Sequence, residues 1–566
     1  MGPHTESNYP FDLGTYAPKI SSSLGRTTRI WFNRGLKWCY GFNHEEAARC
    51  FGKALQDDPY SPLCNWGLAY ALGPNYNKPW FRFDMSVEFP TTRARILRLV
   101  EFADTRISKD ASSLGPMLLE ALKQRVPSEK RDIQSIRKCN AAYADAMERI
   151  YQKYSEDADI AALYADALLN ITPWSIWRLS DGKPTPHSRG LEAKRVLERA
   201  RNTVAGRNHP GILHMYIHLM ELSQTPELAH SLGPRLSQLY PDIGHLVHMP
   251  VHIEVLLGHY GTAIEMNERA CRADEKFAAI RGSKDFYTFF RMHNYHSLVY
   301  AAMFAGKRQT CIDAARRIVQ AASADLLQLK NGADWLESFL SVPIHVWVRF
   351  GNWDQLKNAT FPADSELYCV YTAMLHYGKG IAFAATNNIE EATKHQDLLK
   401  KACKRIPESR LVGNFCISAR TVMRIAEDML AGELEYRKGN YAYAFQCLRD
   451  AIYKEDHLPY SEPWAWMQPT RHAYGALLLE QGHVNEAIKA YEQDLGLDKT
   501  VYRSRWHPNN IWALQGLHEC LLTRLPDDLD YLQDIGDKLT KARESADVDI
   551  TASCYCKQSA WSCCTS

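Results

Sequence analysis

The sequence predicts an all-α fold, a tetratricopeptide-like helix-turn-helix solenoid in which helix pairs stack into an α-α superhelix. Strand patterns are scarce, and apolar residues recur at helical spacing along most of the 566 residues. Paired-helix units also recur along the chain. In three of them a Gly-x-[Tyr/Val]-x-x-Ala turn joins two amphipathic helices, with small residues where the helices would cross closely.

The helix pairs can be placed in order along the chain. The first covers residues 31–70, and Asn43 is expected to cap its second helix, where Glu45 and Glu46 favour the positive N-terminus. Later units of the same plan cover residues 161–169, 248–275, 432–456 and 472–495. Each unit buries its apolar face against its neighbours, so the array is expected to form one core.

No convincing break in composition divides the array. We therefore expect residues 1–27 to form an N-terminal extension, residues 28–545 a continuous solenoid, and residues 546–566 a Cys-rich tail. Two Pro- and Trp-rich inserts, 74–90 and 172–186, interrupt the array. Both are expected to pack against it, because tryptophan side chains are costly to leave in water.

Composition argues against several classes of partner. The chain has 67 basic and 65 acidic residues, and this balance argues against a nucleic-acid partner, which needs a basic face to neutralise phosphates. The first twenty residues lack the basic and apolar regions of a signal peptide, and no run of 18 apolar residues could span a membrane. The 15 cysteines are mostly scattered, as in reduced proteins, so we expect a cytoplasmic protein.

Histidine is concentrated in one part of the chain. Ten of the 21 histidines fall between residues 209 and 296. Their spacing places several of them on common helix faces, at i and i+4, at i, i+3 and i+7, or at i and i+3. These are His214 and His218, then His245, His248 and His252, then His293 and His296. Pro250 requires a helix to begin near it, with His248 in the turn.

Three such groups on neighbouring helices could converge on one metal site, since helices pack about 8–10 Å apart. Neutral imidazole binds copper, zinc and iron, and a site with many imidazoles and no obligatory carboxylate favours copper. Glu221 could serve as a ligand, as an acceptor behind a ligand, or as a general base. The alternative is that these histidines are structural, as isolated histidines on helices usually are.

A second cluster of polar and aromatic residues lies in YSEPWAWMQPTRH. Tyr460, Glu462, Trp464, Trp466 and Arg471 could line a substrate pocket, with the arginine available for a carboxylate or an oxyanion. In the alternative interpretation the segment is an insert between repeats, whose aromatic residues cover the core and whose Glu462 and Arg471 pair with each other.

The chain also resembles a family of tetratricopeptide-repeat proteins found in bacteria and fungi. The resemblance covers about residues 42–556 and rests on FNHEEAARCF, WGLAYALGPNYN, DALLNITPWSIW with DGKPTP, HPGILHMYIHLME, HLVHMPVHI, HNYH, YSEPWAWMQPTRH and DVDITASCYC. It implies a helical-repeat fold and little about chemistry, although some fungal members look like biosynthetic accessory enzymes. It adds His44, Asn75 and Asn77 as candidate site residues.

Together these observations predict a metal-dependent oxidoreductase, a copper oxidase or oxygenase acting on a small organic molecule. The seven histidines would hold the metal, with zinc or iron as alternatives to copper, and Glu221, Glu462 and Arg471 would be catalytic. The substrate pocket would contain His44, Asn75, Asn77, Trp174, Tyr460 and Trp466. The competing hypotheses are a non-catalytic scaffold that binds a peptide or protein partner, and a zinc-dependent hydrolase or lyase.

Overall fold

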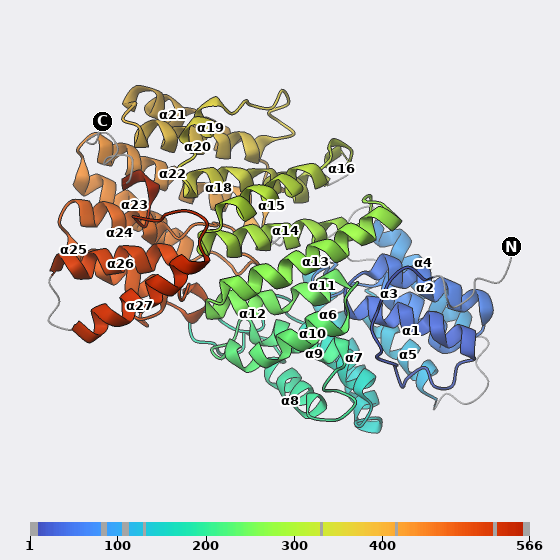
Figure 1. Cartoon of the computed structure of the whole chain (residues 1–566). Helices are drawn as coiled ribbons and strands as arrows, with labels where there is room; N and C mark the ends of the chain where they lie inside the picture. The colour runs from blue at the N-terminus through green and yellow to red at the C-terminus, as the bar shows by residue number, and fades with distance from the viewer. Residues whose placement is uncertain are drawn as a thin grey trace. The chain divides into compact units, whose positions relative to one another are not determined.

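The computed structural model describes residues 9–80, 88–104, 113–127, 132–328, 332–413, 417–524 and 529–557. It is about 70% helical, and the strands of its described part form one two-stranded antiparallel ladder, β1 (Leu411–Val412) with β2 (Ile417–Ser418). Many successive helices are joined by short turns, whereas longer segments join α7 to α8 and α23 to α24 (Figure 1). The predicted all-α, tetratricopeptide-like fold class is confirmed.

The chain divides into two compact units. Unit 1 comprises residues 1–253 and 268–290, and unit 2 comprises residues 254–267 and 291–566. The boundaries expected from the sequence, at 1–27, 28–545 and 546–566, remain a prediction. Residues 9–27 of the extension and 546–557 of the tail are described, whereas Cys563 and Cys564 lie outside the described residues.

The first helices along the chain belong to unit 1. They are α1 (Arg26–Tyr40), α2 (His44–Asp57), α3 (Pro62–Leu72), α4 (Glu88–Asp104), α5 (Leu114–Arg125), α6 (Ile133–Lys153), α7 (Ala158–Leu169), α8 (Gly190–Arg201), α9 (Pro210–Met220), η2 (Pro226–Leu232), α10 (Gly233–Leu239) and α11 (Gly244–His248). Three helices contribute residues to both units, and they are α12 (Pro250–Leu257), α13 (Tyr260–Arg281) and α14 (Tyr287–Phe304).

The remaining helices belong to unit 2. They are α15 (Arg308–Ala321), α16 (Ala324–Gln328), α17 (Gly332–Leu336), η3 (Glu337–Ser341), α18 (Val342–Arg349), α19 (Trp353–Asn358), α20 (Cys369–Ala385), α21 (Ile389–Arg405), α22 (Ala419–Arg437), α23 (Tyr441–Asp456), α24 (Thr470–Glu480), α25 (Val484–Leu495), η4 (Arg503–Arg505), α26 (Ile511–Arg524) and α27 (Leu529–Ser545).

The first helix pair of unit 1 forms as its local sequence predicts. The Asn43 side chain accepts a hydrogen bond from the backbone N–H of Glu46 at 3.1 Å and so caps α2. Helices α1 and α3 each approach α2 closely at a glycine, because a Cβ on Gly35 or Gly67 would lie 2.9 or 2.5 Å from the ring of Phe51 in α2. The predicted cap is confirmed, and small residues allow the helices to cross.

The residues before α1 are fastened to unit 1. The Trp38 indole donates to the Tyr9 hydroxyl at 2.6 Å, and that hydroxyl donates to Glu46 at 3.0 Å. Glu46 is also held by both ends of the Arg281 guanidinium, each at 2.8 Å. Residues 9–25 therefore belong to the folded core of the unit.

Helices α24, α25 and α26 of unit 2 meet around Tyr491. A Cβ on Gly475 would lie 2.5 Å from the Tyr491 ring, and one on Gly516 would lie 2.3 Å from it. The Tyr491 hydroxyl exchanges a 2.6 Å hydrogen bond with Ser553, which anchors the described part of the Cys-rich tail. Close packing against this ring requires glycine on both flanking helices.

Replacing Gly516 by alanine is expected to destabilise unit 2 by about 1–3 kcal/mol, because the new methyl group overpacks the Tyr491 ring. Gly261→Ala provides the control, since nothing lies within 4 Å of that position in α13. There, alanine is expected to stabilise the helix by about 0.5–1 kcal/mol. Urea denaturation of both variants measures the difference, and equal stabilities would contradict the packing described.

A buried polar network surrounds Asp494 at the end of α25. Its carboxylate pairs with the Nε2 of His472 at 2.7 Å and the Nδ1 of His507 at 2.8 Å, and it accepts from Asn510 at 2.9 Å. On the other side of the ring, the His472 Nδ1 lies 2.9 Å from the Arg349 guanidinium. Burial lowers the pKa of His472 to about 4, although Asp494 opposes the shift.

This network predicts that unit 2 loses stability as the pH falls from about 6.5 to 4. His472 has a lower pKa in the folded chain than its usual 6.5, so the unfolded chain binds the proton first and protonation favours unfolding. His472→Gln removes the titrating group, and the slope of unfolding free energy against pH should be shallower in that variant. Identical slopes in the two proteins would refute the assignment.

Candidate metal centre

Helix α9 carries the first two predicted ligands. His209 caps it, accepting from the backbone N–H groups of Gly211 and Ile212, and Pro210 is its first residue. Every residue of α9 is buried, so both His214 and His218 lie inside the unit, one turn apart on the same face. His209 therefore has a structural role as the cap of α9.

The next three histidines lie on two short helices. His245 and His248 belong to α11, and His252 belongs to α12, which begins at Pro250 as the sequence predicts. The backbone N–H of Met249 bonds to the carbonyl of His245 at 3.0 Å, so the chain continues between the two helices in helical form. Five of the predicted ligands are therefore located in unit 1.

Three of these imidazoles converge. One ring nitrogen from each of His214, His218 and His245 lies within 4.8 Å of the others, a spacing at which they could hold one metal ion. The ring centroid of His214 lies 4.8 Å from that of His218 and 4.9 Å from that of His245. All three side chains are completely buried.

Hydrogen bonds fix the orientation of two rings. The His214 Nδ1 donates to the backbone carbonyl of Tyr40 at 2.6 Å, and the His218 Nδ1 bonds to the Glu221 carboxylate at 2.8 Å. The Nε2 atoms of both rings have no hydrogen-bond partner within the described part of the chain. A proton on Nδ1 leaves the Nε2 lone pair available, which is the arrangement that metal-binding histidines adopt.

The aromatic ring of Phe42 covers the three imidazoles. Its centroid lies 4.4 Å from that of His214, 5.9 Å from that of His218 and 5.3 Å from that of His245. Phe42 has a φ of 58°, in the left-handed region, at the turn between α1 and α2. This turn brings both the ring and the nearby Tyr40 carbonyl to the site.

Burial keeps His214 and His218 neutral. Burial lowers the pKa of His218 to about 3 and lowers the pKa of His214 well below its usual 6.5. A neutral imidazole is the form that binds a metal ion. The electrostatics of unit 1 are therefore compatible with metal ligation by this set.

Glu221 connects this set to the remaining two histidines of unit 1. Its second carboxylate oxygen lies 3.2 Å from the His252 Nδ1, and the Nε2 atoms of His252 and His248 are 2.9 Å apart. Glu221 is thus an acceptor behind two imidazoles, one of the three roles expected from the sequence. His248 is therefore hydrogen-bonded to His252, which in turn contacts Glu221.

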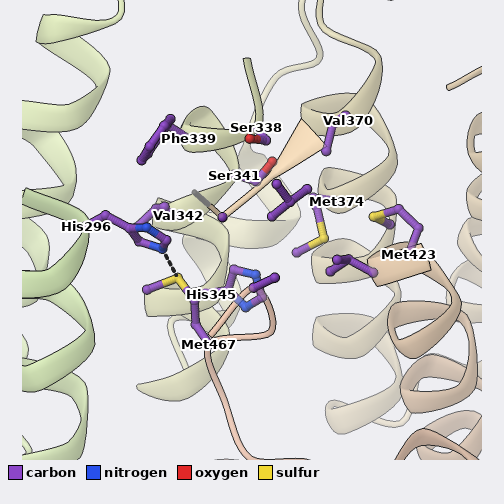
Figure 2. Close-up of a pocket in the computed structure, with 14 residues that line it drawn as sticks. His296, Ser338, Phe339, Ser341, Val342, His345, Val370, Met374, Met423 and Met467 are labelled. Atoms are coloured by element: carbon purple, nitrogen blue, oxygen red, sulfur yellow. Dashed lines mark hydrogen bonds between the residues drawn. The ribbon is translucent and has the colours of Figure 1, made fainter. Parts of the chain in front are cut away.

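His293 and His296 belong to unit 2, and both are buried. The His296 Nε2 lies 3.2 Å from the sulfur of Met467 and faces a small cavity (Figure 2). The structure brings three of the seven predicted ligands together in unit 1. A single pocket shared by all seven histidines remains a prediction.

The predicted substrate-pocket residues also divide between the units. In unit 1, His44 lines a cavity of about 270 Å³ with Trp80 and Phe89. The Asn75 side chain accepts from the backbone N–H groups of Asn77 and Lys78 at 3.0 and 2.8 Å, which is a turn-forming role. One substrate pocket that contains all six of the predicted residues remains a prediction.

Trp174, the other unit-1 member of that set, is buried. Its backbone N–H donates to the Tyr76 hydroxyl at 3.0 Å, and its ring packs edge-on against the Tyr76 ring. The insert that contains Trp174 therefore packs onto the unit, as expected for a segment rich in tryptophan.

In the segment YSEPWAWMQPTRH, Arg471 has a different ion-pair partner from the one expected. Arg471 forms a two-point ion pair with Asp456, both contacts at 2.7 Å, so the alternative in which it pairs with Glu462 is wrong. Tyr460, Glu462 and Trp466 are buried in unit 2. The partner of Arg471 comes from the end of α23, and no local spacing indicates it.

Among the described residues, no helix is both long and apolar enough to cross a membrane. No protein-family model matches the sequence, and no curated protein matches it.

Several solved structures match the chain over most of its length. Yeast Tom70 is 13% identical, with 91% of this chain and 93% of that chain covered and a TM-score of 0.28. A human IFIT1 dimer with m7Gppp-AAAA is 10% identical, with 92% and 91% covered and a TM-score of 0.32. The APC/C hetero-tetramer Cut9-Hcn1 is 12% identical, with 94% and 95% covered and a TM-score of 0.27.

The prediction that the chain is a metal-dependent oxidoreductase is corrected by the partners of the predicted catalytic residues and has no support among the matched structures, which are helical-repeat proteins. Two residues expected to be catalytic have structural partners instead. Glu221 holds His218 and His252, and Arg471 is held by Asp456.

Proposed function

We propose that the chain is a non-catalytic helical-repeat scaffold whose first unit is built around a transition-metal ion held by His214, His218 and His245. The observation that carries this proposal is the convergence of their ring nitrogens to within 4.8 Å in a completely buried site. Two of the rings are already oriented by acceptors on Nδ1, as in known metal sites.

Burial supports a structural role for the ion. Structural zinc sites have four protein ligands and catalytic sites three with one open position; this set has three ligands, but its fourth position lies in a completely buried site rather than in a solvent-accessible pocket. Phe42 covers the imidazoles on one side, and the Tyr76 ring lies 4.5 Å from that of His218. An ion in this position would tie together α9, α11 and, through the Tyr40 carbonyl, the end of α1.

Imidazole donors favour zinc or copper, and iron binds the same ligands. The identity of the ion follows from elemental analysis of the purified full-length chain. We expect wild-type protein to contain one more metal equivalent than the His214→Ala/His218→Ala variant. His187→Asn, which alters an exposed histidine with a positive φ, is the matched control and should retain the ion. Equal metal content in wild type and the double variant would refute the proposal.

The partner of the scaffold would be a protein or peptide with an acidic segment. A groove of about 910 Å³ in unit 1 lies between α6 and residues 171–189. Exposed Arg137 and Lys138 line it beside Ile133, whose side chain is 48% exposed. Cationic and apolar groups in one groove suit an acidic peptide with an apolar anchor.

Selection of displayed peptides on the immobilised full-length chain tests this groove. We expect acidic sequences to be enriched. These peptides should bind the Arg137→Glu/Lys138→Glu variant at least about tenfold more weakly than they bind the wild-type chain. Lys53→Glu, on exposed α2 surface, is the control for charge alone and should bind as wild type does. Enrichment without a preference for acidic residues would argue against this docking site.

A further inference from the structure

A small cavity in unit 2 is surrounded by soft metal donors. Its volume is about 30 Å³, and its lining includes two imidazoles and three thioethers, from His296, His345, Met374, Met423 and Met467. Figure 2 shows these side chains reaching the cavity from α14, α18, α20, α22 and the segment before α24. A cavity needs about 10–15 Å³ to hold one water-sized particle, so this one has room for an ion.

The donors nearest to each other are His296 and Met467. The His296 Nε2 and the Met467 sulfur are 3.2 Å apart. The sulfur can only accept, so the His296 Nε2 donates this hydrogen bond and must give up its proton before it can bind a metal. Metal–nitrogen and metal–sulfur bonds of about 2.0–2.3 Å place two donors of one ion about 3–4 Å apart, so the two side chains are close enough to share an ion.

His345 supplies a third donor. Its side chain is 5% exposed, and its Nδ1 has no hydrogen-bond partner within the described part of the chain. Burial lowers the pKa of His345 and of His296 to about 3, so both rings are neutral. A neutral buried imidazole beside a cavity is available to a metal ion.

The segment that carries Met467 is fixed against α18. The Gln468 amide donates to the backbone carbonyl of His345, and the Trp466 ring packs edge-on against the His345 ring with centroids 5.0 Å apart. These contacts on both sides of Met467 fix the segment beside His345, and His296, His345 and Met467 line the same cavity.

We infer that this cavity is a binding site for copper(I), with His296, His345 and Met467 as ligands and with Met374 and Met423 as further thioether donors. Thioethers are soft ligands that select copper(I), whereas magnesium, calcium and manganese prefer oxygen donors. No carboxylate is among the described residues that line the cavity. The site is independent of the three-histidine set of unit 1, which has no sulfur ligand.

Anaerobic titration of the full-length chain with copper(I), against a competing chelator, tests this site. The titration uses the His214→Ala/His218→Ala background, so that the unit 1 set does not contribute. We expect one copper(I) equivalent to bind, and Met467→Leu to weaken the affinity about tenfold or more. Leucine has nearly the volume of methionine, so that variant should remain folded.

Met429→Leu is the matched control, because it changes a buried methionine of α22 that does not line the cavity. It should bind copper(I) as the background protein does, and excess zinc should not displace the ion. Circular dichroism confirms that each variant is folded. Absence of copper(I) binding in the background, or equal affinities of Met467→Leu and Met429→Leu, would overturn the inference and leave the unit 1 proposal untouched.

Discussion

Replacing Asp494 by alanine is expected to lower the stability of unit 2 by about 3–5 kcal/mol, because three buried polar groups lose an acceptor and each unsatisfied buried group costs about 1–3 kcal/mol. The substitution removes the acceptor shared by His472, His507 and Asn510, all of which are buried. It also leaves the Arg349 guanidinium beside an imidazole that has lost its carboxylate partner. Three buried polar groups would lose their acceptor at once.

Asp494→Asn is the matched comparison for this effect. An amide keeps one acceptor oxygen and nearly the same volume, so we expect a smaller loss than in the alanine variant. Denaturant unfolding monitored by tryptophan fluorescence measures both. A loss below about 1 kcal/mol in Asp494→Ala would show that the network contributes little, since that is the net value of a single ordinary hydrogen bond.

The second large effect concerns the ion that we propose for unit 1. A metal that binds the folded chain alone stabilises it by about 2.7 kcal/mol at one hundred times Kd and by about 4.1 kcal/mol at one thousand times Kd. We therefore expect zinc or copper(II) added to the chelator-treated chain to raise Tm, and His214→Ala to abolish the rise. His214 is completely buried, so this variant will also be less stable without metal.

Control variants separate the two effects of His214→Ala, which are the loss of metal binding and the lower stability of the metal-free protein. His187→Asn and Met467→Leu should both keep the metal-dependent rise in Tm, because neither alters the three-histidine set. The quantity compared is the shift caused by metal within each protein, so differences in starting stability do not matter. A full shift in His214→Ala would mean that the ion binds elsewhere.

The sequence predicted those features of the fold that depend on neighbouring residues. The Asn43 cap, the helix that starts at Pro250 and the glycine turns depend on residues within a few positions of one another. Repeated helix pairs then predict the all-α architecture. The division into two units could not be predicted, because it depends on which helices contact one another across long stretches of sequence.

The metal centre could be predicted only in part. Helical spacing indicated the faces that carry His214, His218 and His245, but not which groups would meet. The Tyr40 carbonyl that orients His214 is a backbone atom and carries no sequence signal. The pairing of His296 with Met467 joins residues 171 positions apart, and no local spacing relates them.

X-ray absorption at the metal edge of the metal-loaded, full-length Met467→Leu chain counts the ligands of the ion proposed for unit 1. We expect nitrogen neighbours with the more distant scattering of three imidazoles, and we expect this signal to be lost in His214→Ala/His218→Ala. A shell of oxygen or sulfur without imidazole scattering, or one unchanged in the double variant, would contradict the proposal.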